Sequence, residues 1–123
     1  MRYFDANCQI GRYNRWSGRE PITSQALLSA MDHYGIHEAL ILDSLAREVH
    51  PLDGNERCLH LAADHPRLHA AWVGLPPRSR ELPPSADLVA EMQERGVCAF
   101  FLYPQQYHFT LDDWCVDELL GPM

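Results

Sequence analysis

Hydrophobic and polar positions along the chain follow two alternating periods. Residues 3–10, YFDANCQI, alternate apolar with polar side chains, which is typical of a strand. Residues 23–34 place apolar side chains at helical spacing, with Thr23 or Ser24 suited to cap the start and Gly35 suited to end the helix. Residues 38–44 form a nearly continuous apolar run, which predicts a strand buried on both faces.

The rest of the chain repeats this order. Further strands are predicted within residues 68–77 and 97–104, and further helices within residues 52–66, 83–96 and 110–123. Pro66 ends the second helix, while Ser85 and Gly96 are suited to cap and terminate the third. Alternating strands and helices predict an α/β fold in which helices cover a parallel sheet.

Composition narrows the class of protein. The 123 residues suit one domain, and a hydrophobic content of 46% is enough for a core. No apolar run is long enough to span a bilayer or to act as a secretion signal, so we expect a cytoplasmic protein without a membrane partner. The net charge of −7 argues against nucleic acid as a partner.

Two residue types bear on the chemistry that is available. All ten basic residues are arginine, which excludes a Schiff-base lysine, a carbamylated lysine ligand and a Walker-loop lysine. The four cysteines stand at positions 8, 58, 98 and 115, and none has the short paired spacing of a zinc site. We expect reduced and mostly buried thiols.

Polar side chains alternate along the first predicted strand, at Asp5, Asn7 and Gln9. This row either lines the floor of a binding site or meets water at a half-solvated strand. The loop that follows combines arginine with an aromatic residue, at Arg12, Arg15, Trp16 and Arg19. Such a loop either binds a carboxylate or phosphate or simply covers the end of the sheet.

Two further candidates follow predicted strands. Asp43 ends the second strand and either contacts a substrate or Arg12, or caps the next helix. His108 follows the fourth strand and is either an acid or base near neutral pH or an ordinary surface histidine. The proline-rich loop LPPRSRELPPS, residues 75–85, lies at the carboxyl end of the third strand, where α/β folds place ligands.

Four segments together resemble one family. They are YFDANCQIG, LLSAMDHYGIHEALILDS, AADHPRLHAAWVGLPP and MQERGVCAFFLYP, in this order along the chain. The set is similar to the first half of amidohydrolase-related metal-dependent hydrolases. The resemblance implies that residues 1–123 form the four-stranded N-terminal half of a TIM-type (β/α)₈ barrel, with Asp5, Asn7 and Gln9 pointing inward.

The resemblance also exposes a difference. Relatives hold a divalent metal with two histidines on the first strand, and those positions are Asn7 and Gln9 here. Carboxamides are poor ligands for transition metals, so we expect no metal cofactor and no hydrolase activity from this chain alone. Asp5, Asn7, Gln9 and Arg12 would line a pocket for a small-molecule substrate, while the catalytic residues stay unassigned.

Two other hypotheses remain open. The chain is alternatively a non-catalytic interaction or structural subunit, whose exposed sheet edges pair with a second copy or with a missing C-terminal half. A third hypothesis is a complete four-stranded binding domain. The first loop, NCQIGRYNRWSG, has no G-x-G-x-x-G pattern, which argues against nucleotide binding.

Overall fold

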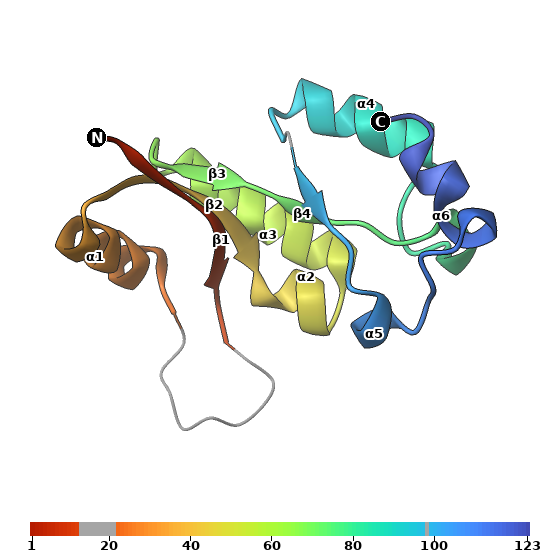
Figure 1. Ribbon diagram of the computed structural model, residues 1–123, viewed down its shortest axis with the longest axis horizontal. Helices are drawn as coiled ribbons and strands as arrows, with labels where there is room; N and C mark the ends of the chain where they lie inside the picture. Colours follow the sequence, from red (N-terminus) through yellow and green to blue (C-terminus); the bar gives the residue numbers. More distant parts are fainter. Residues whose placement is uncertain (13–21, 98) are drawn as a thin grey trace.

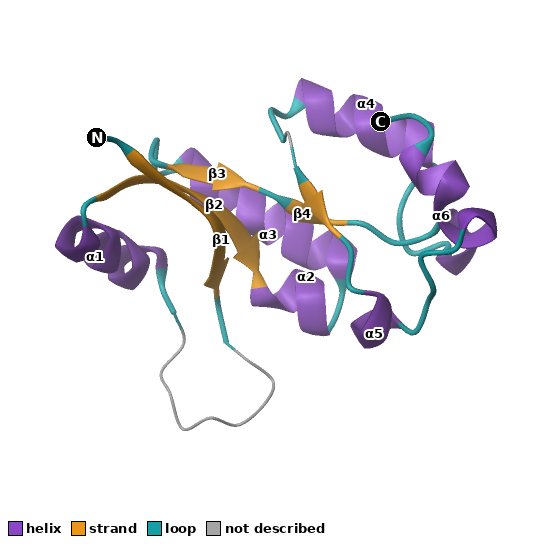
Figure 2. Ribbon diagram, in the orientation of Figure 1, coloured by secondary structure: helices purple, strands orange, loops and turns teal. Residues whose placement is uncertain are grey.

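The computed structural model describes residues 1–12, 22–97 and 99–123, and strands and helices alternate along them (Figures 1 and 2). The strands are β1 (Tyr3–Ile10), β2 (Ile36–Asp43), β3 (Leu68–Ala70), β4 (Trp72–Val73) and β5 (Phe100–Phe101). The helices are α1 (Ser24–Tyr34), α2 (Ser44–Glu48), α3 (Pro51–Ala63), α4 (Ser85–Glu94), α5 (Pro104–Tyr107) and α6 (Asp113–Leu120), with a 3₁₀ turn at Pro77–Ser79. None of these helices combines the length and apolar content that a membrane span requires.

The predicted α/β fold with a parallel sheet is confirmed. Strands β1, β2 and β3 pair in parallel in that order, and β4 pairs in parallel with β5. The segment predicted as one strand is divided at Ala71, whose N–H donates to the Ile41 carbonyl at 2.9 Å. The next N–H, of Trp72, donates to the Ala99 carbonyl at 3.1 Å. The segment thus changes partner from β2 to β5, and the described strands form no closed barrel.

Helices cover one face of the β1–β3 sheet. Ala39 and Ile41 of β2 point to this face and are fully buried, in one apolar cluster with Met31 of α1 and Cys58 of α3. Residues paired across a parallel ladder share a face, so their β3 partners Leu68 and Ala70 lie there too. Leu88 and Met92 of α4 and Leu119 of α6 extend the same cluster.

The opposite face of the sheet is open near the start of the strands. We call it the open face and define it by Phe4, Glu38, Leu40 and His69, which are all at least partly exposed. Further along the strands this side is covered by α2 and α5, because Leu42, Ala46 and Val73 form a second buried cluster against Tyr103 and Tyr107. The open face is therefore restricted to the amino-terminal half of the sheet.

Helix boundaries follow local sequence only in part. Thr23 caps α1 by accepting a hydrogen bond from the Ala26 N–H, and Gly35 ends it at φ +70°, as predicted. The expectation for Ser85 is wrong, because Pro84 holds the cap position of α4 and no side chain caps that helix. The predicted fourth strand is shorter than expected: among its described residues, 97 and 99–104, only Phe100–Phe101 are paired as a strand before α5 begins at Pro104.

A buried asparagine fastens α3 to the sheet. Asn55 is 3% exposed; its Nδ2 donates to the Val73 carbonyl at 3.0 Å and its Oδ1 accepts from the Val73 N–H at 2.7 Å. The preceding Gly54 lies so close to α2 that a Cβ there would be 2.0 Å from the Ala46 backbone nitrogen. These two neighbours fix α3 against β4 and α2 against α3.

We expect Asn55→Ala to lower the free energy of unfolding by about 2–4 kcal/mol, because both backbone polar groups of Val73 lose their buried partner. Urea unfolding followed by circular dichroism measures the difference. Gln93→Ala is the matched control, since it removes an exposed amide side chain from α4 and should change stability by less than about 0.5 kcal/mol. Equal stability of the two variants would contradict the role of Asn55.

Candidate functional site

The polar row predicted on β1 is divided by a bulge. Asp5 pairs with Ala39 and Cys8 with Ile41, so three steps along β1 match two along β2. Asp5 therefore lies on the helix-covered face, whereas Gln9, paired with Leu42, lies on the opposite face. The prediction that Asp5, Asn7 and Gln9 share one inward face is wrong. The same shift places Phe4, paired with Glu38, on the open face, whereas Cys8, paired with Ile41, lies on the helix-covered face.

Asp5 has a local role at the bulge. Its carboxylate accepts a hydrogen bond from the Asn7 N–H at 3.0 Å, which satisfies a backbone group displaced from the ladder. Burial, together with the nearby Asp5 carboxylate, raises the pKa of the Cys8 thiol to about 12. Asp5 therefore organises the strand, while contacts of Asn7 and Gln9 with a substrate stay predictions.

The divalent metal implied by the resemblance does not fit these residues. The side chains at the two histidine positions are carboxamides, and the Oε1 atom of Gln9 is buried without a hydrogen-bond partner among the described residues. Asn7 is exposed and lies within the bulge. No group of three or more His, Cys, Asp or Glu side chains in the described ranges is arranged to hold a metal ion. These residues therefore do not suit the divalent metal that the resemblance implies.

Asp43 lies at the junction of β1, β2 and α3. It is fully buried; one carboxylate oxygen caps α2 by accepting from the Leu45 N–H at 2.8 Å, and the other accepts from Arg57 Nε at 2.9 Å. Of the two interpretations offered by the sequence, the helix cap is the one observed. Its cationic partner is Arg57 of α3 and not Arg12.

Arg12 closes the same junction through its backbone. The Ser44 hydroxyl donates to the Arg12 carbonyl at 2.8 Å, while the Arg12 side chain is exposed. Gly11 has φ +105°, and a Cβ on it would lie 2.4 Å from the Ser44 Oγ, so this position requires glycine. Arg15, Trp16 and Arg19, predicted to form a binding loop with Arg12, lie outside the described residues.

A cavity of about 380 Å³ lies at the carboxyl ends of β4 and β5, and we call it the carboxyl-end cavity. Its walls come from the loop that follows β4 and from the stretch that runs from the end of α5 to the start of α6: Leu75, Pro76, Arg78, Ser79, Glu81, Tyr107, His108, Phe109, Thr110, Trp114 and Cys115. The volume falls in the lower part of the range for small-molecule sites. The structure thus brings His108 together with the proline-rich loop.

His108 is held in an unusual backbone conformation. It ends α5 at φ +55°, in the left-handed region that non-glycine residues seldom adopt. The side chain is exposed at the cavity wall and forms no hydrogen bond or ion pair within the described part of the chain. His108 is therefore available to a ligand, whereas Asp43 is not.

Tyr107 forms the inner wall of the cavity. Its hydroxyl donates to the Ala46 carbonyl at 2.5 Å, which links α5 to α2. Burial, followed by the negative charge of Glu81, raises the pKa of Tyr107 to about 12. The phenol thus stays protonated near neutral pH and serves as a wall and a donor to the backbone, and not as a base.

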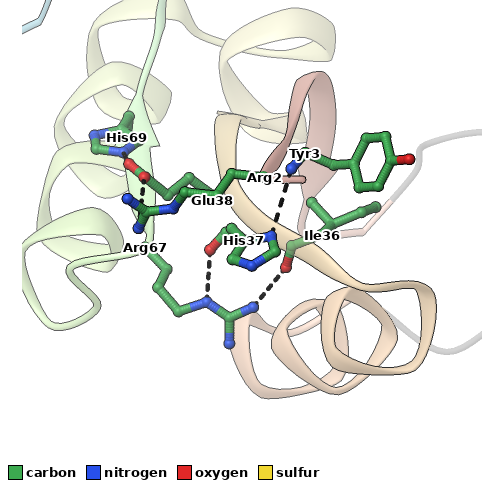
Figure 3. Close-up of polar contacts among 7 residues, drawn as sticks. All are labelled: Arg2, Tyr3, Ile36, His37, Glu38, Arg67 and His69. Atoms are coloured by element: carbon green, nitrogen blue, oxygen red, sulfur yellow. Dashed lines mark hydrogen bonds and ion pairs between the residues drawn. The ribbon is translucent and has the colours of Figure 1, made fainter.

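The open face carries a second group of polar side chains, at the other end of the sheet (Figure 3). His69 Nε2 and Glu38 Oε2 are 2.7 Å apart, and the Phe4 ring stacks on His69 with centroids 5.9 Å apart. Arg67 lies beside them but bonds to the start of β2, donating to the Ile36 and His37 carbonyls, both at 2.7 Å. This group has no signature in the sequence, because its members stand on three different strands or at strand ends.

Alkaline pH should destabilise the fold. Burial raises the pKa of the Cys58 thiol to about 12, against 9.0 for an exposed thiol, and the pKa values of Cys8 and Tyr107 rise in the same direction. The unfolded chain therefore loses these protons first, and the free energy of unfolding falls as pH rises from about 9 towards 12.

For the fully buried Cys58 the loss is at most about 1.4 kcal/mol per pH unit in that window. Urea unfolding at a series of pH values measures the slope. Cys58→Ala should be less stable at pH 7 and show a shallower decline above pH 9. A free energy of unfolding that stays constant or rises over this range would contradict the prediction.

No family model, no curated protein and no solved structure matches the chain.

Proposed function

We propose that the chain is a barrel-type βα unit, of the amidohydrolase-related kind that its sequence resembles, which binds a small organic molecule in the carboxyl-end cavity. The observation that carries the proposal is the place of that cavity. It opens where β4 and β5 end, which is the end of a parallel sheet at which α/β and barrel folds bind ligands.

The wall of the cavity supports binding of an organic ligand. Leu75 and Pro76 are buried, and Phe109 is half-buried, so the interior is largely apolar. Arg78, Glu81 and His108 add a few polar groups that can orient a ligand, which is the usual composition of such sites. Binding rather than hydrolysis is proposed, because the residues at the strand-one ligand positions, Asn7 and Gln9, do not suit a metal.

The test combines ligands with metal. We expect at least one small aromatic acid, amine, amino acid or alcohol to shift the backbone amide NMR signals of Glu81, Tyr107 and Thr110 at millimolar concentration. Zinc or manganese should leave the melting temperature unchanged, whereas a metal at 100 times its Kd would stabilise the fold by about 2.7 kcal/mol. Absence of any ligand-induced shift in the cavity, or strong stabilisation by metal, would overturn the proposal.

A second candidate function rests on the unpaired edge of the sheet. In the described residues β1 pairs only with β2, which leaves an eight-residue strand with one unpaired edge. The adjacent open face exposes 54% of Phe4. Long open edges with apolar side chains are templates for pairing with another chain. We therefore propose as the alternative that the unit pairs through this edge with a second copy.

Size-exclusion chromatography with light scattering tests the pairing. We expect a concentration-dependent dimer at micromolar concentrations and at least about tenfold weaker association for Phe4→Lys, because charged side chains on an edge oppose pairing. Leu111→Lys is the matched control, since Leu111 is 59% exposed in the segment between α5 and α6, which lies across the molecule from β1 (Figure 1), and should leave association unchanged. A wild-type chain that is monomeric throughout would rule out pairing with a second copy.

A further inference from the structure

The carboxyl-end cavity contains an aromatic side chain that the fold itself does not bury. Trp114, the second residue of α6, lines the cavity and is 66% exposed. Its neighbours Cys115 and Val116 are buried, so α6 is held in place by other residues. The exposed indole and the half-buried Phe109 line the same cavity, and an indole offers a flat apolar surface on which a planar ring can stack.

Two opposite charges line the same cavity. Arg78 and Glu81 stand three residues apart in the loop after β4, and both side chains are exposed. In the described part of the chain neither side chain forms an ion pair or a hydrogen bond, with each other or with another residue. Arginine binds carboxylates through a planar fork of donors, and a glutamate carboxylate binds an ammonium group.

The two charges limit the kind of ligand. A simple carboxylate would gain a contact with Arg78 but be repelled by Glu81, in a chain whose net charge is −7. A simple amine would gain from Glu81 and be repelled by Arg78. A ligand with adjacent positive and negative groups satisfies both side chains, and its apolar part then meets the aromatic wall.

We propose that the carboxyl-end cavity binds an α-amino acid with an aromatic side chain. The α-carboxylate contacts Arg78, the α-ammonium contacts Glu81, and the ring lies against Trp114 and Phe109. This inference rests on the proposed function, because it names the ligand class of the same cavity.

Tyr107 fits a binding role for the cavity. Its hydroxyl is engaged by the Ala46 carbonyl, so the phenol ring presents its carbon atoms to the ligand. The contact also holds α5 in place, and His108 and Phe109, which line the cavity, directly follow this helix. The cavity wall is thus formed before a ligand arrives, which lowers the entropic cost of binding.

Four compounds with one ring and different polar groups test the inference: phenylalanine, 3-phenylpropionate, phenethylamine and 2-phenylethanol. Their Kd values are measured by the change in the Trp114 indole NMR signal, which Trp114→Phe assigns. We expect phenylalanine to bind at least about tenfold more tightly than each of the other three, a difference of about 1.4 kcal/mol.

Charge-neutral variants locate the two contacts. Arg78→Gln should weaken phenylalanine and 3-phenylpropionate, whereas Glu81→Gln should weaken phenylalanine and phenethylamine, each by about tenfold. Arg80→Gln is the matched control for the first, since Arg80 is exposed in the same loop but does not line the cavity. Glu94→Gln, on α4, serves the same purpose for the second.

The outcomes separate the two proposals. Equal binding of all four compounds, or tightest binding of one with a single charge, would overturn the amino-acid inference and leave ligand binding at the cavity intact. The inference would also be overturned if Arg78→Gln and Glu81→Gln bound phenylalanine as tightly as the unmodified chain. Weaker binding in the control variants Arg80→Gln or Glu94→Gln alone would have the same consequence. No binding of any compound, here and in the wider panel, would overturn the proposed function as well.

Discussion

The two hydrogen bonds between the Asn55 side chain and the Val73 backbone position the elements around the cavity. They hold α3 at β4, next to Ala71, where the chain changes its pairing partner from β2 to β5. With α3 fixed, Gly54 sets how closely α2 approaches, because nothing larger than hydrogen fits against the Ala46 backbone. The Ala46 carbonyl in turn accepts the Tyr107 hydroxyl. The inner wall of the cavity is thus connected to the core through one sequence of contacts.

Parts of this arrangement were predictable because they depend on neighbours in sequence. Helix α1 follows from apolar side chains at helical spacing, a cap at Thr23 or Ser24 and a Gly35 terminator; the cap is Thr23 and Gly35 ends the helix, while Tyr34, at the end of the apolar stripe, is exposed. The parallel α/β sheet follows from alternating strand and helix patterns. The half-barrel stays a prediction. The described strands, β1 to β5, form no closed barrel, and parallel strands with helical connections occur in open sheets as well as in barrels.

The errors arose where pairing between distant segments overrides local pattern. A strict two-residue alternation places Asp5 and Gln9 on one face, but one extra residue in β1 reverses the second half of the strand. The sequence contains no glycine or proline at the bulge to indicate it. Asp43 shows the related limit: a carboxylate before a helix reads equally as ligand or cap, and only the contact with Arg57, 14 residues away, decides it.

The cavity could be predicted only by its location. The sequence places the loop after β4 and His108 at the carboxyl ends of strands. That Arg78, Glu81 and Trp114 line one cavity depends on how α6 packs against α4. An exposed tryptophan on a short amphipathic helix has no signal in the sequence that separates it from a core residue.

Ligand binding and chain pairing are physically separable in this fold. The open face lies near the start of the parallel strands, where Phe4, Glu38 and His69 gather, whereas the cavity lies beyond the ends of β4 and β5. Between them Leu42 and Val73 are fully buried under α2 and α5. A strand added along β1 would cover Phe4 without contributing to the cavity wall. Variants at Phe4 should therefore change association without changing ligand affinity, and variants at Arg78 should do the reverse.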